Sequence, residues 1–559
     1  MRRMSLCASV LTLFLAGAAF AAPRQAAWPS LDQQLKTSRV QPGTPLEKLI
    51  QANQDFGMLR ADEAHDKLPV PLWLRVYWRK GHPEGNYSAS DPTGGYPLVL
   101  KEMAEWMMLH QDLIATEADE WRAPGADPDA VFEEKVVGEK TTVSANARLS
   151  GAQTVPRSES DIRINYLNPL KIIAASNNIG GTGQQAQYYS GDGGATWGQS
   201  FLPLVSTDSF HSDPTVDWTS DGTAWSATIG IKGQTLKLRA YKSTDSGATW
   251  TFDNTFSGSQ RSTDKELIWI DHSPTSPFKD SIYACWHNGN PAYANVRTST
   301  GWGTPKQVSG AESSGTAIGC SLGSNANGDA FVFWPTTSNR RIVVAKTTNG
   351  GSTWGTPVVI ATTFDGYDIG VPSFANRRAL IYVSGAAYRT ATVNNVYASW
   401  VDLTGASGCN TASNEPGTNA ASTCKTRIWV ARSTDGGATW GAPVMINNQA
   451  SLNDQFNQWL GVDDTTGRIA VIYYDTVGDS TRKTTNVWYQ TSSDNGATWS
   501  AATQLTTGST NETIAGADSG NQYGDYNSLS IFAGKIFPSW TDRRSGGKEE
   551  IWTVPVVEP

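Results

Sequence analysis

The sequence predicts an all-β protein whose main body is a seven-bladed β-propeller with a small helical N-terminal module. Three observations predict this fold. One octapeptide ending in Trp recurs five times, and each copy follows a strand-like segment. Gly (53 residues) and Trp (22 residues, about three times the usual share) are enriched, while charged residues make up only 17% of the chain. Four-stranded units that repeat at intervals of about 50 residues bury their faces against one another, and they close into a ring without free edges.

The octapeptide has the pattern Ser/Thr-x-Asp/Asn-x-Gly-x-Thr-Trp. Its five copies are SGDGGATW (190–197), STDSGATW (243–250), TTNGGSTW (347–354), STDGGATW (433–440) and SSDNGATW (492–499). The Asp or Asn accepts hydrogen bonds from the amides of its own turn, the Gly supplies a positive φ, and the Trp covers the hairpin. We therefore expect the Asp residues of the motif to be structural: Asp192, Asp245, Asp435 and Asp494.

The spacing of the motif reveals two further units. Trp302, in NVRTSTGWGTP, lies midway between Trp250 and Trp354 and marks a degenerate copy, and EIWTVPV (550–556) is a last strand without a motif after it. In each of the seven units, two further strand-like segments precede the strand that leads into the motif. Six units also have a fourth strand after the motif, and the seventh lacks one. We expect EKTTVSANAR (139–148) to supply the missing strand and close the ring. A six-bladed ring and an open solenoid are the alternatives; a solenoid would need a capped end.

The N-terminal part differs in character from the repeats. Residues 1–22 combine Arg2 and Arg3, a short apolar stretch and an Ala-Phe-Ala site, a pattern typical of a signal peptide. The sequence therefore predicts a secreted or periplasmic protein. Residues 23–135 contain no repeat and carry apolar residues at helical spacing, so they are predicted to form a helical module. The propeller is predicted to span residues 136–559.

Four cysteines follow the predicted signal peptide. Cys409 and Cys424 bracket a Gly-, Ser- and Asn-rich loop, and we expect them to form a disulfide. Cys285 and Cys320 lie in two apolar segments. They either pair between neighbouring units or are separate small buried side chains.

Charge and hydropathy exclude several classes of function. The 44 Lys and Arg residues against 52 Asp and Glu residues give a formal charge of −8, without the basic surface that nucleic-acid binding needs. The mean hydropathy is −0.38, and the one apolar run that stands out is the short stretch in the predicted signal peptide, so no membrane span is expected. The expected state is a monomer that needs no cofactor, although a structural Ca²⁺ is compatible with the acidic residues.

The octapeptide resembles the Asp-box, or BNR, repeat of the sialidase superfamily. SDPTVDWTSDG and GDYNSLSIFAGKIFPSWTDRR also resemble segments of secreted bacterial proteins described as exo-sialidase-like. The resemblance implies a propeller that acts on extracellular glycans or glycoproteins as a glycoside hydrolase. It also implies a Tyr nucleophile assisted by a Glu, an Asp acid/base and an arginine clamp for a substrate carboxylate.

Propeller geometry places such a site on the rim opposite the Asp-box hairpins. The resemblance assigns Tyr526 (in DYNSL) as the nucleophile, Glu266 as its partner, and Asp525 or Asp213 as the proton donor. Arg163, in IRIN, and Arg543 would bind the substrate together with Asp542, or Asp542 and Arg543 would form an ion pair that holds a loop.

The segment where the resemblance would place the acid/base Asp, SNNIGGTGQQAQ, contains no acid. This favours the alternative of a non-catalytic propeller that binds a glycan or a protein. A lyase, which would need a Tyr/His or a Tyr/Arg pair, is a third alternative; His211 and His287 are candidates for such a pair. Aspartates also recur beside the predicted strands of this rim, either as an acidic funnel or as caps of strand ends, and their recurrence favours capping. They are Asp213, Asp264, Asp402, Asp454, Asp475, Asp525 and Asp542.

Overall fold

The computed structural model describes residues 142–417 and 422–558. The predicted signal peptide (1–22) and helical module (23–135) lie outside the described residues. Within the described ranges, the only helical elements are two 3-10 turns, η2 (Ala311–Ser313) and η3 (Ala412–Asn414). No helix in that part of the chain is long and apolar enough to cross a membrane.

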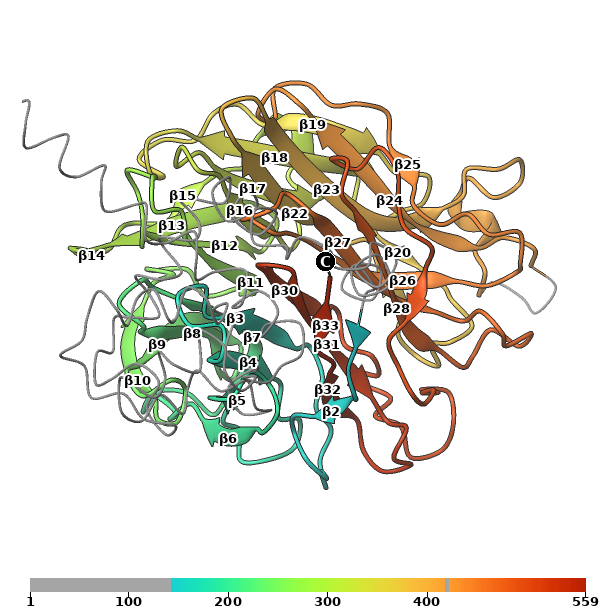
Figure 1. The fold of residues 1–559 in the computed structure, drawn as a ribbon, viewed down its shortest axis with the longest axis horizontal. Helices are drawn as coiled ribbons and strands as arrows, with labels where there is room; N and C mark the ends of the chain where they lie inside the picture. Colours follow the sequence, from blue (N-terminus) through green and yellow to red (C-terminus); the bar gives the residue numbers. More distant parts are fainter. Residues whose placement is uncertain (1–141, 418–421, 559) are drawn as a thin grey trace, which may run out of the picture. The chain divides into compact units, whose positions relative to one another are not determined.

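Seven antiparallel sheets confirm the predicted seven-bladed propeller over the six-bladed alternative. Figure 1 shows the first strands of the blades grouped around the centre and the fourth strands at the periphery. Blades 1 to 3 are β3 (Asp161–Ile164), β4 (Ile172–Ser176), β5 (Ala186–Ser190), β6 (Gly198–Phe201); β7 (Phe210–Trp218), β8 (Ala224–Lys232), β9 (Thr235–Ser243), β10 (Thr251–Thr255); and β11 (Thr263–Ile270), β12 (Ile282–Asn288), β13 (Ala292–Thr298), β14 (Gly301–Trp302), with β15 (Lys306–Gln307) also paired to β13.

The later blades repeat the same order of pairing. Blades 4 to 6 are β16 (Ser321–Ser324), β17 (Ala330–Pro335), β18 (Arg341–Thr347), β19 (Val358–Thr362); β22 (Ser384–Arg389), β23 (Asn394–Leu403), β24 (Thr426–Ser433), β25 (Val444–Met445); and β26 (Gln455–Val462), β27 (Ile469–Asp475), β28 (Asn486–Ser492), β29 (Thr503–Gln504). Between blades 4 and 5 the chain inserts a short hairpin, β20 (Asp368–Ile369) and β21 (Ala379–Leu380). Blade 7 begins with β30 (Ser528–Phe532), β31 (Lys535–Asp542) and β32 (Glu550–Thr553).

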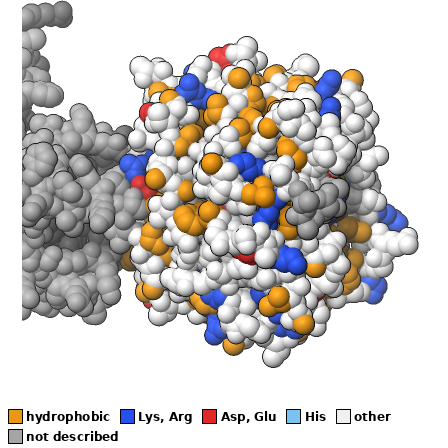
Figure 2. Space-filling view, turned by 90° about the vertical axis from the view of Figure 1, so that its right-hand side faces the viewer, with side chains coloured by type: hydrophobic (Ala, Val, Ile, Leu, Met, Phe, Trp, Pro, Cys, Tyr) orange, Lys and Arg blue, Asp and Glu red, His pale blue; other side chains and the backbone are white. Residues whose placement is uncertain are grey.

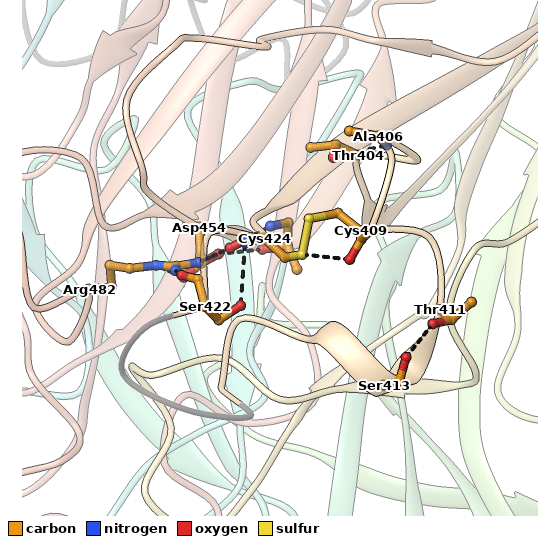
Figure 3. The surroundings of a disulfide bond; sticks show 11 residues. Thr404, Ala406, Cys409, Thr411, Ser413, Ser422, Cys424, Asp454 and Arg482 are labelled. Atoms are coloured by element: carbon orange, nitrogen blue, oxygen red, sulfur yellow. Dashed lines mark hydrogen bonds and ion pairs between the residues drawn. A yellow bond between two sulfur atoms is a disulfide. The ribbon is translucent and has the colours of Figure 1, made fainter.

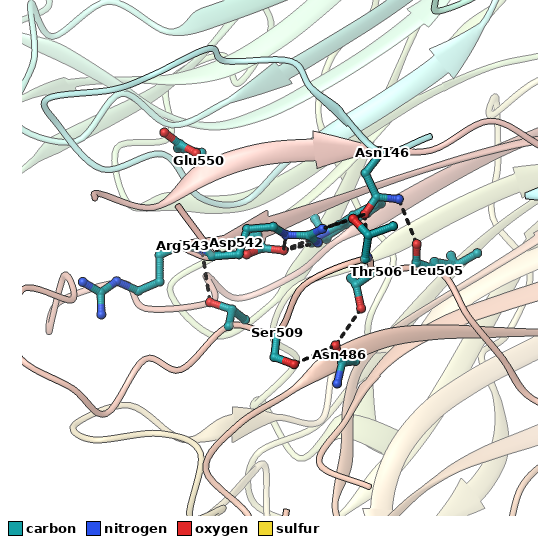
Figure 4. A network of polar contacts seen from close by, with 12 residues as sticks. Asn146, Asn486, Leu505, Thr506, Ser509, Asp542, Arg543 and Glu550 are labelled. Atoms are coloured by element: carbon teal, nitrogen blue, oxygen red, sulfur yellow. Dashed lines mark hydrogen bonds and ion pairs between the residues drawn. The ribbon is translucent and has the colours of Figure 1, made fainter. Parts of the chain in front are cut away.

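The N-terminal strand closes the ring, as the sequence predicted. β2 (Ala147–Arg148) pairs with β32 as the fourth strand of blade 7, and β1 (Thr142–Val143) pairs with β33 (Val556–Val557). Figure 4 shows Asn146 between blades 6 and 7, where its side-chain amide donates to the carbonyl of Leu505 at 2.8 Å. Every blade therefore has at least four strands, and the solenoid alternative is wrong.

The core lies between the blades. Fully buried tryptophans recur on the second strands of four blades: Trp286, Trp334, Trp400 and Trp540. Polar side chains of one first strand also bind the backbone of the next. The Oγ atoms of Ser321 and Ser384 accept from the amides of Gly385 and Leu460 at 2.9 Å in both cases. The side of the propeller seen in Figure 2 shows apolar side chains scattered among polar ones, as on an ordinary protein surface.

All five Asp-box hairpins have the expected turn. In the copy at 433–440, the carboxylate of Asp435 accepts from the amide and the hydroxyl of Thr439 and from the hydroxyl of Ser433, at 2.5–2.9 Å. The Gly at the fifth position of each copy has a positive φ between 78° and 95°. Asp192, Asp245, Asn349 and Asp494 make the equivalent bonds to a Thr four residues later. These residues are structural, as predicted.

Two disulfides link neighbouring parts of the chain. Cys409 and Cys424 pair as predicted, with a Cα–Cα distance of 5.3 Å, beside the buried ion pair of Asp454 and Arg482 (Figure 3). Cys285 pairs with Cys320, so the open question is answered in favour of a disulfide between units. This second bridge joins β12 of blade 3 to the residue before β16 of blade 4.

Candidate functional site

Seven residues occupy equivalent positions at the start of the first strands, on the rim opposite the Asp-box hairpins. Each lies two residues before the point where its first strand becomes regularly paired. β7, β11 and β26 change register there, which leaves Asp213, Lys265 and Asn457 in bulges. We call this set the axial ring: Glu159, Asp213, Lys265, Gly319, Tyr382, Asn457 and Tyr526.

Backbone strain marks the axial ring. Glu159, Asp213, Lys265 and Asn457 have φ values of 57°, 53°, 50° and 46°. The left-handed conformation costs a non-glycine residue about 1–2 kcal/mol. Gly319 adopts it (φ 61°) without that cost, and a Cβ there would lie 2.3 Å from the Tyr382 ring. Strain of this kind persists where the surroundings fix the backbone, and it gathers at functional sites.

A buried lysine lies against the predicted nucleophile. Nζ of Lys265 lies 3.4 Å from the ring centroid of Tyr526 and 5.4 Å from that of Tyr382. Lys265 is 2% exposed, and within the described residues its ammonium forms no hydrogen bond. Burial lowers the pKa of Lys265, and the carboxyls of Asp213 and Glu159 oppose that shift.

Glu159 and Asp213 form a carboxyl pair bridged by one asparagine. Nδ2 of Asn177 donates to Glu159, and its Oδ1 accepts from the Asp213 amide at 2.8 Å. Burial, followed by the charge of Asp213, raises the pKa of Glu159 well above its usual range. Burial and Asp264 raise the pKa of Asp213, while hydrogen bonds from Ser212 and with Glu159 lower it. Burial and the mutual repulsion of the two carboxyls therefore favour retention of a proton by the pair.

Tyr526 and Glu266 lie within the field of this pair. Tyr526 is 3% exposed and donates to the carbonyl of Pro214 at 3.4 Å. Burial raises the pKa of its phenol well above 10, and the charges of Asp213, Glu159 and Glu266 add to the shift. Glu266 is fully buried, neither of its carboxyl oxygens has a hydrogen bond within the described residues, and burial and Asp213 raise its pKa as well. The structure thus brings three predicted residues, Tyr526, Glu266 and Asp213, together at the axis.

The axial ring and Glu266 form one cluster, which reaches solvent through three side chains. Asp264, beside Lys265, has 52% of its side chain exposed. Asp525 forms an ion pair with Arg377, which extends from the insertion between blades 4 and 5, and these side chains are 19% and 26% exposed. The amide of Asp525 also donates to Glu159 at 3.1 Å. These contacts place the open side of the cluster on the predicted rim.

The other predicted binding residues have internal partners. Arg163 donates to the carboxylate of Asp161 at 2.7 Å and to the hydroxyl of Ser528 at 2.9 Å. Arg543 pairs with Glu549 at 3.6 Å, and its side chain points away from Asp542 in Figure 4. Asp542 forms an ion pair with Arg544, so the alternative prediction of an Asp542–Arg543 pair is wrong. In the described residues, no contact joins Arg163, Arg543 or Asp542 to Tyr526.

The recurring aspartates of this rim divide into two groups. Asp402, Asp454, Asp475 and Asp542 accept from backbone amides of neighbouring loops, as the capping interpretation expects. Asp213, Asp264 and Asp525 instead converge on the axial ring. The two histidines of the lyase alternative also separate: His287 accepts from the amide of Gly319 at 3.0 Å, whereas His211 lies 3.3 Å from the hydroxyl of Tyr241. Burial lowers the pKa of each histidine to about 4.

Sequence reasoning missed Glu159, Asn177 and Lys265. Glu159 and Lys265 stand at the same offset from their strands as Asp213 and Tyr526, so an alignment of the seven units would have identified them. Asn177 lies in the acid-free segment SNNIGGTGQQAQ and contributes an amide there. No group of three or more His, Cys, Asp or Glu side chains in the described ranges is arranged to hold a metal ion.

Comparisons with known proteins support the repeat type. The family described as BNR repeat-like domain matches residues 417–517, in agreement with the predicted Asp-box resemblance. No curated protein matches the chain. Similar solved structures include a leech intramolecular trans-sialidase (11% identity, TM-score 0.41, 66% of this chain and 72% of that chain). Others are an α-L-arabinofuranosidase from Fusarium graminearum (12%, 0.38, 62% and 92%) and a protein of unknown function from Dyadobacter fermentans (11%, 0.38, 75% and 99%).

Proposed function

We propose that the protein is a glycoside hydrolase that acts on glycans outside the cytoplasm, with the axial ring as its active site. One observation carries the proposal: a buried tyrosine, an ammonium above its ring and two carboxyls of displaced pKa meet at the open end of the propeller axis. Pairs of titratable groups with displaced pKa values are typical of acid–base catalysis. Tyrosine nucleophiles are known among glycosidases.

The two carboxyls take opposite roles in the proposed reaction. Tyr526 is protonated at rest, because its pKa is raised. As its phenolic oxygen bonds to the anomeric carbon, Asp213 accepts the phenol proton, and Glu159 protonates the departing glycosidic oxygen. Water then attacks the glycosyl-enzyme and transfers a proton to Glu159, and the phenolate leaves and recovers its proton from Asp213. The cycle returns every group to its starting state.

Lys265 assists the nucleophile without contacting the sugar. An ammonium above an aromatic ring is attracted by the ring electrons, and the attraction grows as negative charge develops on the phenol oxygen. Glu266, predicted as the partner of Tyr526, adds a third carboxyl to the same buried set. Asp525, predicted as a possible proton donor, is engaged by Arg377 and in this proposal positions the loop before Tyr526.

Incubation with a mixed glycan panel tests the proposal, with products identified by mass spectrometry. We expect the purified protein, with its disulfides intact, to release a free sugar and Tyr526→Phe to release none. Tyr188→Phe is the matched control, because Tyr188 is also fully buried but bonds Ser176 within blade 1. Sugar release by Tyr526→Phe at the wild-type rate would rule out this nucleophile.

A non-catalytic glycan-binding propeller is the second candidate. The low exposure of Tyr526 favours it, because a nucleophile must meet its substrate. A glycan array separates the two candidates: the second predicts retention of a glycan without any product, and no effect of Tyr526→Phe on retention.

The export part of the proposal rests on the N-terminal sequence and the disulfides. Structural disulfides persist mainly in oxidising compartments. Expression with residues 1–22 should deliver a protein that begins near Ala22 outside the cytoplasm, as determined by N-terminal sequencing. Retention of the full N-terminus in the cytoplasm would contradict it.

A further inference from the structure

The arginines near the site are already bound to the protein. Arg163 is engaged by Asp161 and Arg377 by Asp525. Arg482 pairs with Asp454, and Arg543 with Glu549. Arg427 is fully buried and donates to the carbonyls of Thr426 and Asn453 at 2.8 and 2.6 Å. A carboxylate on a substrate is usually held by an arginine fork, and each of these forks has an internal partner.

The open side of the cluster is acidic. Its carboxyls are Glu159, Asp213, Asp264, Glu266 and Asp525, and its cations are Lys265 and Arg377. Arg377 is paired with Asp525, so Lys265 is the remaining cation among these residues. Its ammonium is buried and faces the Tyr526 ring, so it is directed at the nucleophile and away from the entrance.

Asp264 is an exposed carboxyl on the open side of the cluster. Its side chain is 52% exposed, against 19% for the side chain of Asp525. Its Oδ2 lies 3.9 Å from Nε2 of His287. The pKa of His287 is about 4, so this histidine is neutral near pH 7 and does not offset the charge. A carboxylate at the entrance accepts hydrogen bonds from sugar hydroxyls and repels a second carboxylate.

We propose that the site takes neutral glycosyl units and rejects sugars that carry a carboxylate, such as sialic and uronic acids, with Asp264 as the specificity-determining residue. This inference rests on the proposed hydrolase function. It differs from what the sialidase resemblance implies. The propeller architecture is the same, but the arginines that would bind a substrate carboxylate are paired with groups of the protein itself.

Matched aryl glycosides test the substrate class. The protein with intact disulfides is assayed on 4-nitrophenyl hexosides and pentosides, on the corresponding uronides and on an aryl sialoside. We expect turnover of at least one neutral glycoside and at least a hundredfold preference for it over the acidic sugar of the same configuration, because a like-charge contact is strongly unfavourable. Asp264→Lys should reduce this preference at least tenfold, and Asp264→Asn should reduce it less. Asp464→Lys is the control, since Asp464 is exposed on the opposite rim.

The possible results distinguish a wrong substrate class from a wrong hydrolase function. Turnover of acidic sugars that depends on Tyr526 would overturn the substrate class and leave the hydrolase in place. If no aryl glycoside is cleaved, Tyr526→Phe is applied to a glycan array: retention of neutral glycans alone supports the substrate class without hydrolysis, and retention of acidic glycans overturns it. Failure to cleave or retain any glycan would overturn both proposals.

Discussion

The Asp-box hairpins and the axial ring stand at opposite rims of the same blades, and both use carboxylates, but with opposite electrostatics. In the hairpins, hydrogen bonds from Thr439 and Ser433 lower the pKa of Asp435 to about 2. In the ring, burial raises the pKa of Glu159 well above its usual value. One carboxylate is saturated with donors and faces water, while the other is enclosed with a second carboxyl beside it.

The two regions of each repeat serve separate purposes, one structural and one functional. The hairpin sites hold Asp or Asn in all five copies, and each copy makes the same bonds. The seven ring positions share their place at the start of the first strands, and five of them have a positive φ, but they hold Glu, Asp, Lys, Gly, Tyr, Asn and Tyr. Identical residues at equivalent sites stabilise each blade separately, whereas different residues at equivalent sites build one asymmetric centre that the seven blades share.

The largest expected effect is on catalysis at the ring. Glu159→Gln keeps the size of the side chain and removes its transferable proton, so we expect kcat to fall by about 10²–10⁴-fold on a neutral glycoside. Glu312→Gln, on the same rim, should leave kcat unchanged, because a Gln oxygen can still accept from the Gly310 amide. Steady-state kinetics of both variants provide the measurement, and full activity of Glu159→Gln would remove Glu159 from the mechanism.

The second largest effect is expected when either disulfide is removed, and the two disulfides should differ. Replacing Cys285 and Cys320 by Ala opens a loop of 35 residues and should lower the free energy of unfolding by about 4 kcal/mol, against about 3 kcal/mol for the 15-residue loop of Cys409 and Cys424. Only the first pair should also reduce activity, because Cys320 follows Gly319 of the ring. Urea unfolding without reductant and an assay of each variant measure both effects; equal losses of activity would contradict this distinction.

The pH dependence of stability should have opposite signs in the two regions. Because the pKa of folded Glu159 is raised, the folded protein binds more protons than the unfolded chain above about pH 4.3, and its stability falls as the pH rises. Glu159→Gln should therefore stabilise the protein by about 1 kcal/mol or more at pH 7.5 and by less at pH 4. Thermal melting at the two pH values measures this, and an equal shift at both would show that the charge of Glu159 is not the cause.

The smallest effect is expected at the hairpins. The pKa of Asp435 is depressed, so its contribution is complete above about pH 4 and is lost as the pH falls toward 2. Asp435→Asn should change stability by less than about 0.5 kcal/mol at pH 7 and remove this acid sensitivity, because Asn349 already serves in blade 4. Asn349→Asp should add the same sensitivity there. Acid titration followed by circular dichroism provides the measurement.

Local bonds explain how much of the fold could be predicted. The hairpin motif contains its own donors, acceptors and glycine, so its five copies and their spacing reveal the two remaining blades and imply the closing strand at Ala147–Arg148. The disulfide between Cys409 and Cys424 could likewise be predicted, because the two residues bracket one short loop. These features depend on residues close together in the chain, which a single sequence displays directly.

The ring depends on contacts that cross the propeller. Nζ of Lys265 meets the ring of Tyr526 only because a bulge in β11 turns that side chain toward the axis, and the sequence shows no sign of the bulge. The ion pair of Arg163 with Asp161 could have been predicted from the sequence. Asp161 and Arg163 are two residues apart in a strand and therefore share a face, which is the geometry of an ion pair.

The closing strand also sets an order of events during synthesis. β2 leaves the ribosome before any complete blade, but its partner β32 is made much later, and the ion pair of Arg148 and Glu550 spans 402 residues. Six blades can therefore fold while β2 is unpaired, and the seventh gains its outer strand only after β32 has been made. Until then, each side of the gap presents an open sheet edge of the kind that draws chains into aggregates.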